Sequence, residues 1–559
     1  MFFKAVLKIF IGLLFFISLI FAQEEENQSQ NQSELITQEL PQSNETQSVG
    51  STESQSSSLL ISSSDLTHRL SLFAALDEGQ VIRGSANRSN YDVFNRVWQQ
   101  SMFFHLTNEL SYKERMKLIL SFESRLVFSY KQDNRYPATL QGVFDFYPND
   151  IELNYIFGTQ YEPWLKLGIG YFPYKYNPDT KHLGEYLLRC TAYPTIIYSW
   201  WEFPMVRELG LYAKTNFNIL NIDRLNLDFL FTSETRGWPL QDWTFTAVLG
   251  NNLLNFFDFG AGVSFQRFLS VNELKTTPKV NSNMYLDENG DTNYYTFKST
   301  KLVGRASLNP LRFIPNFTLP LPQFFGNTPF FGNQDLKIYG EAAVLGIENK
   351  VAYMWSTDVN GNPVLVKAPK VGNPPVNYYD SLGDRMPYMV GINLPTQPLI
   401  SYGVLPLLLT KWLKDETGDD IRLLSYITLI PALTSGLLNH FWGWDLRLDV
   451  MALEFEWVSQ RYPNDDYPVL DFTSGNRPLP ASNQTRLNTI VAKAGYPQKV
   501  KYAFYFKKSF FNQRFALSGL IARDHMRPPY NGEYIDAVTD DFVQTKNQWW
   551  WTLRLSANF

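Results

Sequence analysis

Five histidines are the side chains of this sequence best suited to metal binding or to acid–base chemistry near neutral pH. They are His68, His105, His182, His440 and His525. Zinc sites readable from sequence pair two histidines four residues apart around a glutamate, or combine histidines with cysteines. None of the five has such neighbours in sequence. The pattern therefore predicts no metal site, no cofactor and no catalytic group.

One acidic segment resembles a calcium loop at first sight. The run Asp287-Glu288-Asn289-Gly290-Asp291 places carboxylate and amide oxygens close together. A calcium loop of the EF-hand type has glycine at its sixth position and glutamate at its twelfth. Here the glycine stands fourth and the twelfth residue is Lys298. We expect this segment to be a turn.

The remaining chemistry lies in charges that alternate with apolar residues. Across Met116–Tyr130 most even positions are apolar, while the odd positions include Lys117, Glu123 and Arg125. A period of two residues places neighbouring side chains on opposite faces of a β-strand. Each such strand is predicted to have one apolar face and one charged face.

The same alternation marks strands along most of the chain. Each spans about 7–13 residues, close to the ~9–11 that a tilted transmembrane strand requires, and no apolar run after residue 22 is long enough for a transmembrane helix. The expected strands are Trp98–Leu110, Met116–Tyr130, Leu165–Tyr171, Glu208–Phe217, Leu225–Thr232, Asp242–Leu249, Phe257–Gln266, Lys301–Leu308, Leu336–Val344, Trp444–Val450, Val500–Phe506 and Arg514–Ala522. The fold is predicted to be all-β.

The N-terminus is typical of an export signal. Lys4 and Lys8 are followed by the apolar run Ile9–Phe21 and then Ala22. This run is shorter than the ~20 apolar residues of a membrane-spanning helix. We expect residues 1–22 to be a cleaved signal peptide, although Ile20 leaves the position of the cut open. Residues 23–64, rich in Ser, Gln, Asn and Glu, are expected to be a disordered periplasmic segment.

Composition excludes several classes of protein. Cys190 is the single cysteine, so neither a lipid anchor at the signal cleavage site nor an internal disulfide is expected. The formal net charge of −5 offers no basic face for nucleic acid. The aromatic fraction of 16% suits the aromatic girdles of a membrane barrel.

Two segments break the strand pattern. Pro406–Leu438 holds two apolar runs, which are either short helices in a loop or lumen, or two strands. Leu183–Pro194 precedes an aromatic cluster at Tyr198–Trp201; an inward-folded constriction loop and an ordinary surface loop both fit, and the surface loop is favoured. The long polar segments 271–293, 349–385, 461–497 and 527–547 are expected to be extracellular loops.

The C-terminal strand Gln548–Phe559 resembles the terminal recognition strand of Gram-negative outer-membrane β-barrel proteins. In that group, a closing aromatic with apolar residues at alternate positions before it is read by the barrel-assembly machinery. The residues that carry the resemblance are Trp551, Leu553, Leu555, Ala557 and Phe559. It implies an outer-membrane location, and the overall plan resembles porins.

These features predict a transmembrane antiparallel β-barrel over residues 65–559, since a sheet in lipid must close on itself to satisfy its backbone. At about 30 residues per strand with its loops, the barrel should have about 16 strands, within a range of roughly 14–18. Charges cost roughly 2–4 kcal/mol at the lipid midplane, so the following are expected to face the lumen: Arg115, Lys117, Glu123, Arg125, Lys166, Lys337, Glu341, Asp445, Arg447 and Asp449.

The leading hypothesis is a porin-like channel for passive diffusion of small hydrophilic solutes, with no enzymatic activity. The second is a structural or adhesive barrel whose lumen is plugged by 406–438 and whose loops bind a surface polymer or partner. The third is a barrel hydrolase, which needs a histidine beside a serine or carboxylate at the lipid boundary or loop rim. The expected partners are outer-membrane lipid, the assembly machinery and the solutes; trimer formation is left open.

Overall fold

The computed structural model describes residues 59–62, 65–83, 87–88, 91–92, 98–133, 136–159, 163–187, 206–219, 223–233, 242–253, 256–270, 284–294, 299–313, 331–344, 346–347, 351, 353–367, 382–417, 430, 434–435, 438, 445–457, 469–471, 475–477, 500–523 and 549–559. The expected signal peptide, most of the expected disordered segment, His440, His525 and Cys190 lie outside these ranges.

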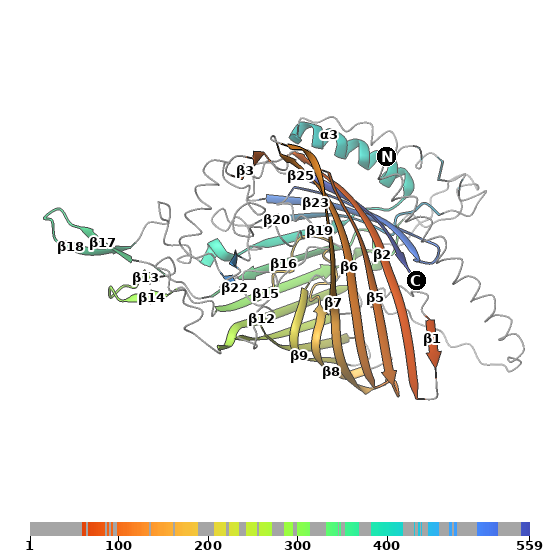
Figure 1. Cartoon of the computed structure of the whole chain (residues 1–559), viewed down its shortest axis with the longest axis horizontal. Helices are drawn as coiled ribbons and strands as arrows, with labels where there is room; N and C mark the ends of the chain where they lie inside the picture. Colours follow the sequence, from red (N-terminus) through yellow and green to blue (C-terminus); the bar gives the residue numbers. More distant parts are fainter. Residues whose placement is uncertain are drawn as a thin grey trace, which may run out of the picture.

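The described residues form a closed antiparallel barrel of sixteen strands (Figure 1). Each strand pairs with the next one around the wall, and the last pairs with the first, which confirms the predicted fold class and strand number. In chain order the strands are β2 (Leu66–Arg83), β5 (Trp98–Tyr112), β6 (Met116–Asp133), β7 (Tyr136–Gly158), β8 (Pro163–Tyr174), β9 (Val206–Ile219), β10 (Asp223–Ser233), β11 (Asp242–Leu253), β12 (Phe257–Ser270), β15 (Ser299–Leu308), β16 (Ile338–Val344), β19 (Tyr388–Asn393), β20 (Val450–Trp457), β23 (Val500–Phe510), β24 (Phe515–Arg523) and β25 (Trp549–Asn558).

The two ends of the barrel differ in their connections. Short turns join β5 to β6, β7 to β8, β9 to β10, β11 to β12 and β23 to β24 at one end, which we call the tight-turn end; the longer connections from β15 to β16 and from β19 to β20 also lie there. Long connections join β8 to β9, β12 to β15, β16 to β19 and β20 to β23 at the other, the long-loop end. Transmembrane barrels have short turns on the periplasmic side and long loops outside the cell.

The wall separates apolar from polar side chains strand by strand. Along β7, Leu153 is 42% exposed while its neighbour Asn154 is 1% exposed, and Ile151 and Tyr155 share the exposed face. The exposed face is apolar on many of the strands, whereas the covered face carries Glu152, Glu454, Glu456, Lys301 and Lys501. A sheet of this inverted polarity, with its apolar face exposed and its polar face covered, is stable only with hydrocarbon outside and a polar lumen inside.

The closing seam places the C-terminal residue inside the hydrogen-bonded wall. Phe559 exchanges both of its backbone hydrogen bonds with Leu72, at 2.9 and 2.8 Å. Its ring is buried and contacts Phe515 edge-on, on the same outer face as Leu555 and Ala557. The predicted terminal strand therefore also closes the barrel.

Three local expectations need correction. Leu59–Ser62, inside the expected disordered segment, forms strand β1 and pairs with β2. The expected strand 444–450 is wrong, since β20 begins at Val450. The expected loops 271–293 and 349–385 contain β13 (Met284–Leu286), β14 (Thr292–Tyr294), β17 (Tyr353–Thr357) and β18 (Pro363–Lys367), which form a separate four-stranded sheet.

The acidic run at Asp287 is a turn, as predicted. The Asp287 carboxylate accepts hydrogen bonds from the backbone N–H groups of Asn289 and Asp291, both at 3.0 Å. The turn joins β13 to β14. Within the described ranges, no group of three or more His, Cys, Asp or Glu side chains could hold a metal ion.

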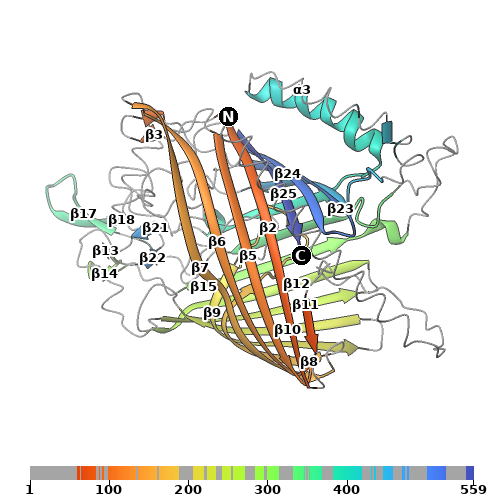
Figure 2. The same ribbon diagram turned by 45° about the vertical axis from the view of Figure 1, so that its right-hand side comes forward.

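The connection from β19 to β20 leaves the tight-turn end and forms a helical segment. The π-helix η5 (Leu399–Val404) runs directly into α3 (Leu405–Thr417), where Pro406 lacks the N–H of a regular α-helix. The segment lies outside the barrel, along β23 and β25 (Figure 2). The plugged-lumen hypothesis required the 406–438 segment inside the barrel, and its described helix is outside. No helix among the described residues is long and apolar enough to cross a membrane.

Candidate functional site

The segment that follows β8 folds into the lumen. We call residues 175–187 the inner loop. Most of its side chains are buried, and it contacts strands that lie far away in the sequence. The surface-loop interpretation that the sequence favoured for Leu183–Pro194 is therefore wrong for its described part, Leu183–Leu187. Residues 188–194 lie outside the described ranges.

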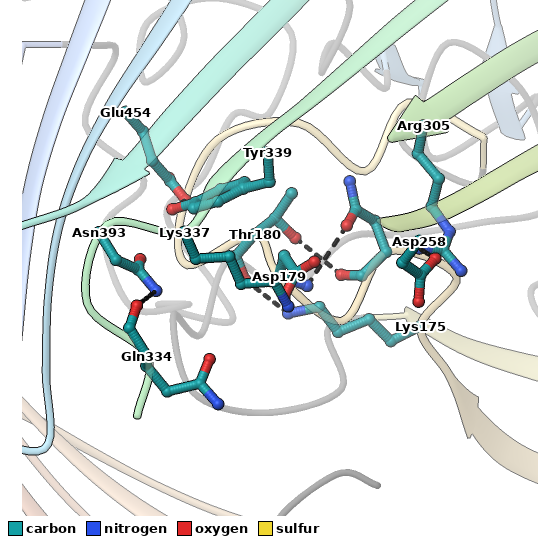
Figure 3. A network of polar contacts seen from close by, with 11 residues as sticks. Lys175, Asp179, Thr180, Asp258, Arg305, Gln334, Lys337, Tyr339, Asn393 and Glu454 are labelled. Carbon is teal, nitrogen blue, oxygen red and sulfur yellow. Dashed lines mark hydrogen bonds and ion pairs between the residues drawn. The ribbon is translucent and has the colours of Figure 1, made fainter. Parts of the chain in front are cut away.

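One carboxylate of the wall holds the tip of the inner loop. Glu454 on β20 accepts three consecutive backbone N–H groups, from Lys181 at 2.6 Å, His182 at 2.9 Å and Leu183 at 2.8 Å. The Tyr339 hydroxyl of β16 donates to the same carboxylate at 2.8 Å (Figure 3). Charge-assisted bonds of this kind are about twice as strong as neutral ones.

Two further carboxylates continue this attachment. Glu341 on β16 accepts the backbone N–H groups of Glu185, at 2.9 Å, and of Tyr186. Glu456 on β20 accepts the N–H of Gly184 at 3.3 Å and also binds Lys501 at 2.7 Å. The loop can present these N–H groups because Gly184 and Glu185 both adopt positive φ, 88° and 62°, which breaks any regular secondary structure there.

Lysines of the wall hold the carbonyl and carboxylate groups of the loop. Lys301 of β15 donates to the Tyr186 carbonyl at 3.0 Å. Lys337, just before β16, forms an ion pair with Asp179. Within the loop, Lys175 donates to the Thr180 carbonyl at 2.7 Å. Figure 3 shows Lys337, Tyr339 and Glu454 converging on this segment.

Apolar contacts complete the docking of the loop. Leu183, Tyr186 and Leu187 belong to one buried cluster with lumen-facing side chains of β8 to β25. Leu187 packs over Gly262 of β12, where a Cβ atom would come within 2.8 Å of it. The His182 ring lies edge-on to Trp550 of β25, with 5.6 Å between centroids. Together with the bonds to β15, β16 and β20, these contacts place the loop against the β12–β25 half of the wall.

The other half of the wall carries charged side chains of both signs, which form ion pairs with one another. Lys117 of β6 binds Glu109 of β5 at 3.0 Å, and Lys166 of β8 binds Glu152 of β7 at 3.2 Å. The Tyr212 hydroxyl of β9 also donates to Glu152. These side chains are partly exposed or lie beside exposed ones, so this half of the wall presents alternating charge to the lumen.

The ten lumen candidates fall into three groups. Lys117, Glu123, Lys166, Lys337 and Glu341 lie on the covered polar face or bind the inner loop, and Arg125 occupies β6 with its side chain outside the described set. Arg115 lies in the exposed turn between β5 and β6. The remaining three, Asp445, Arg447 and Asp449, precede β20 at the tight-turn end instead of lining the wall.

Arg447 has a bracing role at the tight-turn end. Its guanidinium lies 3.6 Å from the Asp335 carboxylate and donates to the Thr396 hydroxyl at 3.1 Å. Asp335 also accepts the backbone N–H of Thr396 at 3.0 Å and that of Gly332 at 2.8 Å. This cluster ties the segments before β16, after β19 and before β20 together.

Glu454 and Glu456, the principal loop anchors, were missed by sequence reasoning. Their signal is a pair of glutamates two residues apart in Val450–Trp457, a spacing that puts both on one face of a strand. The expected strand ended at Val450, so it did not include this face. Lys301 was inside an expected strand but was not singled out.

The hydrolase hypothesis requires a histidine beside a serine or carboxylate at the lipid boundary or loop rim, and an acyl-transfer site further requires that the histidine take the proton of a serine. His105 lies 3.8 Å from Asp150, and the Ser121 hydroxyl donates to the same carboxylate at 2.7 Å. The serine proton is thus directed to the aspartate. His68 binds Asn108 at 2.8 Å, and His182 is in the inner loop. These described contacts do not form the serine–histidine arrangement of an acyl-transfer site.

No family model and no curated protein matches this chain. Among solved structures, a triple mutant of the Rhodopseudomonas blastica porin superimposes with a TM-score of 0.36 at 6% identity, covering 88% of this chain and 100% of that one. Another variant of that porin gives a TM-score of 0.35 at 5% identity with the same coverage. A likeness this distant supports no inference about solute or assembly, so the architecture rests on the strand pairing. By that pairing, and by its inverted polarity, the chain is a porin-like β-barrel of the outer-membrane type.

Proposed function

We propose that the protein is a passive channel for small hydrophilic solutes whose lumen is narrowed by the inner loop. The observation that carries this proposal is the docking of residues 181–186 on three wall carboxylates. A docked loop reduces the cross-section of a lumen without closing the barrel, and it does so at a defined place. No cofactor or energy source is needed for diffusion down a gradient.

Solutes would pass between the inner loop and the wall of β2 to β8. The pairs Lys117–Glu109 and Lys166–Glu152 lie on that wall, and Lys166 retains partial exposure. Charges of both signs along the wall of a narrow aqueous passage create local fields, which order water and favour polar over apolar solutes. We therefore expect a preference for polarity and size more than for one sign of charge.

A swelling assay with proteoliposomes tests this function. Vesicles that contain the refolded barrel should swell in isotonic solutions of small neutral sugars, at rates that fall steeply as the sugar becomes larger. Vesicles with heat-inactivated protein provide the baseline. If folded barrels give that same baseline with the smallest sugar, the channel proposal is wrong.

The cell location follows as part of the proposal. We propose export through the cleaved signal at residues 1–22 and insertion into the outer membrane by the assembly machinery, with Trp551, Leu553, Leu555, Ala557 and Phe559 as the recognised face. Deleting Phe559 should lower the yield of assembled barrel severalfold, because the closing hydrogen bonds with Leu72 would be lost. Heat-modifiable migration of membrane fractions measures that yield; unchanged assembly would contradict this role.

Glu185 should make the docking of the inner loop depend on pH. Its carboxylate accepts from the Thr180 hydroxyl at 3.0 Å and from the Asn177 backbone at 3.3 Å. Burial raises the pKa of Glu185 to about 7, with Lys175 opposing this effect and Glu341 adding to it; the Tyr176 hydroxyl also faces Glu341. In a released loop, the pKa returns to its ordinary value of 4.5.

The docked loop therefore binds the proton more tightly than the released loop. Docking therefore weakens as the pH rises from 4.5 towards about 7 and then stays constant. The fraction of open channels should rise over this window, and Glu185→Gln should reduce the rise; the neighbouring buried carboxyl of Glu341 also titrates, which would account for what remains. Channel recordings at stepped pH measure it. An equally strong rise in the Glu185→Gln variant would exclude Glu185 as its source.

A further inference from the structure

The helical segment η5–α3 packs against the outer face of the wall. Trp412 contacts Trp549 of β25 at 5.2 Å between centroids and Tyr502 of β23 at 5.6 Å, both edge-on. Trp550, the next residue along β25, belongs to the lumen cluster, so Trp549 and Tyr502 point away from the lumen. Trp549 and Leu413 are almost fully buried.

The opposite side of the segment exposes large apolar side chains. Val404 is 49% exposed, Leu407 44% and Leu408 59%. One turn further along the same stripe, the exposed residues are Lys411 and Asp415. The outward stripe therefore changes from apolar to charged within a single helical turn.

This change occurs at a definite depth along the barrel. The segment starts at the tight-turn end, and Trp412 meets Trp549 and Tyr502 near the long-loop ends of their strands. The rise from Leu399 to Trp412 is about 20 Å at ~1.5 Å per residue, compared with an apolar band of about 25 Å in such barrels. The three aromatic rings stand where a barrel has its interfacial girdle, and the charges lie just beyond it.

We infer that η5–α3 is embedded in the lipid bilayer beside the barrel wall, with Val404, Leu407 and Leu408 against the hydrocarbon chains and Lys411 and Asp415 at the headgroups. The neighbouring strands β20 and β25 also expose apolar side chains on their outer face, Phe455 and Leu553. A helix can occupy this position because its backbone hydrogen bonds are internal.

The helical segment covers a region of the outer wall that contains a charged side chain. Arg523 of β24 lies on the outer face and stacks over the Tyr502 ring at 5.4 Å, although it is largely buried. An arginine on a lipid-facing strand is unfavourable by about 0–1 kcal/mol at the depth of the interfacial girdle, where Arg523 lies, and by more towards the midplane. By covering this region, the helix exchanges an aromatic and cationic surface for an apolar one.

Spin labels read by collision with oxygen or with a water-soluble nickel complex test the inference. In the full chain with Cys190→Ser, reconstituted in phosphatidylcholine vesicles, single labels are placed by Leu408→Cys and Lys411→Cys. Val390→Cys on the outer face of β19 serves as the reference for a lipid-facing wall position. The Leu408 label should match the Val390 label, with several-fold greater exposure to oxygen than to nickel. The Lys411 label should show the reverse.

Two results would overturn it. Strong nickel exposure at Leu408 with a normal Val390 reference would place the helix in water. Low exposure of Leu408 to both reagents would mean that protein, such as a second copy of this chain, covers the stripe. A nickel-exposed Val390 label would instead refute the membrane position of the barrel itself and, with it, the helix assignment.

Discussion

Replacing Glu454 by alanine is expected to raise the single-channel conductance several-fold. The substitution removes the acceptor of three consecutive backbone N–H groups of the inner loop and of the Tyr339 hydroxyl. Hydrogen bonds to charged groups contribute ~1.5–3 kcal/mol each, so the docked state should lose at least about 3 kcal/mol. The loop would then leave its position for much of the time, and the passage would widen.

Two further variants separate this effect from a general loss of charge. Glu454→Gln keeps acceptor oxygen and should give an intermediate conductance. Glu109→Ala removes a carboxylate from the opposite half of the wall, where it binds Lys117, and should alter charge preference with little change in conductance. Heat-modifiable migration confirms that each variant is folded. If folded Glu454→Ala conducts like the parent while Glu109→Ala conducts more, the loop does not set the size of the passage.

Replacing Arg554 by methionine should destabilise the barrel by about 3–5 kcal/mol, because a buried carboxylate loses its partner. Arg554 of β25 is fully buried and binds Asp77 of β2 with two bonds, Nε to Oδ1 at 2.7 Å and Nη2 to Oδ2 at 2.9 Å. This ion pair spans the closing seam. Its guanidinium also lies 5.1 Å from the centroid of the Phe103 ring.

The double variant Arg554→Met/Asp77→Asn shows whether the uncompensated charge is the cause. It should recover much of the lost stability, since both charges are then absent. Lys117→Met, at a partly exposed pair, should cost under about 1 kcal/mol. Urea midpoints from tryptophan fluorescence in phospholipid vesicles measure all three. If Arg554→Met is as stable as Lys117→Met, the closing seam does not depend on the Arg554–Asp77 pair.

The fold could be predicted because each strand carries its own information. The alternation in Met116–Tyr130 is local, and in the structure these residues lie in β6, as expected, and pair with β5. The apolar outer face predicted for the terminal strand is also observed, since Leu555 and Ala557 lie on the outer face with Phe559. Strands were missed where alternation is imperfect, as in β2, whose outer face also carries Glu78 beside Gln100.

The inner loop could not be predicted from the sequence, and the reason is physical. Its stability comes from backbone N–H groups meeting Glu454 and Glu456, which stand more than 270 residues further along the chain. No local pattern in Lys181–Tyr186 reports such acceptors. The position of α3 was equally non-local, because it depends on Trp412 meeting Trp549 on the outer face of the wall.

We propose that this barrel conducts through a lumen narrowed by its inner loop, and single-channel recording in planar bilayers measures that conduction. Refolded protein should produce discrete, ohmic current steps that are small for a sixteen-stranded barrel and become several-fold larger in Glu454→Ala. Bilayers that contain demonstrably folded barrel, yet show no steps with either the parent chain or Glu454→Ala, would contradict the claim.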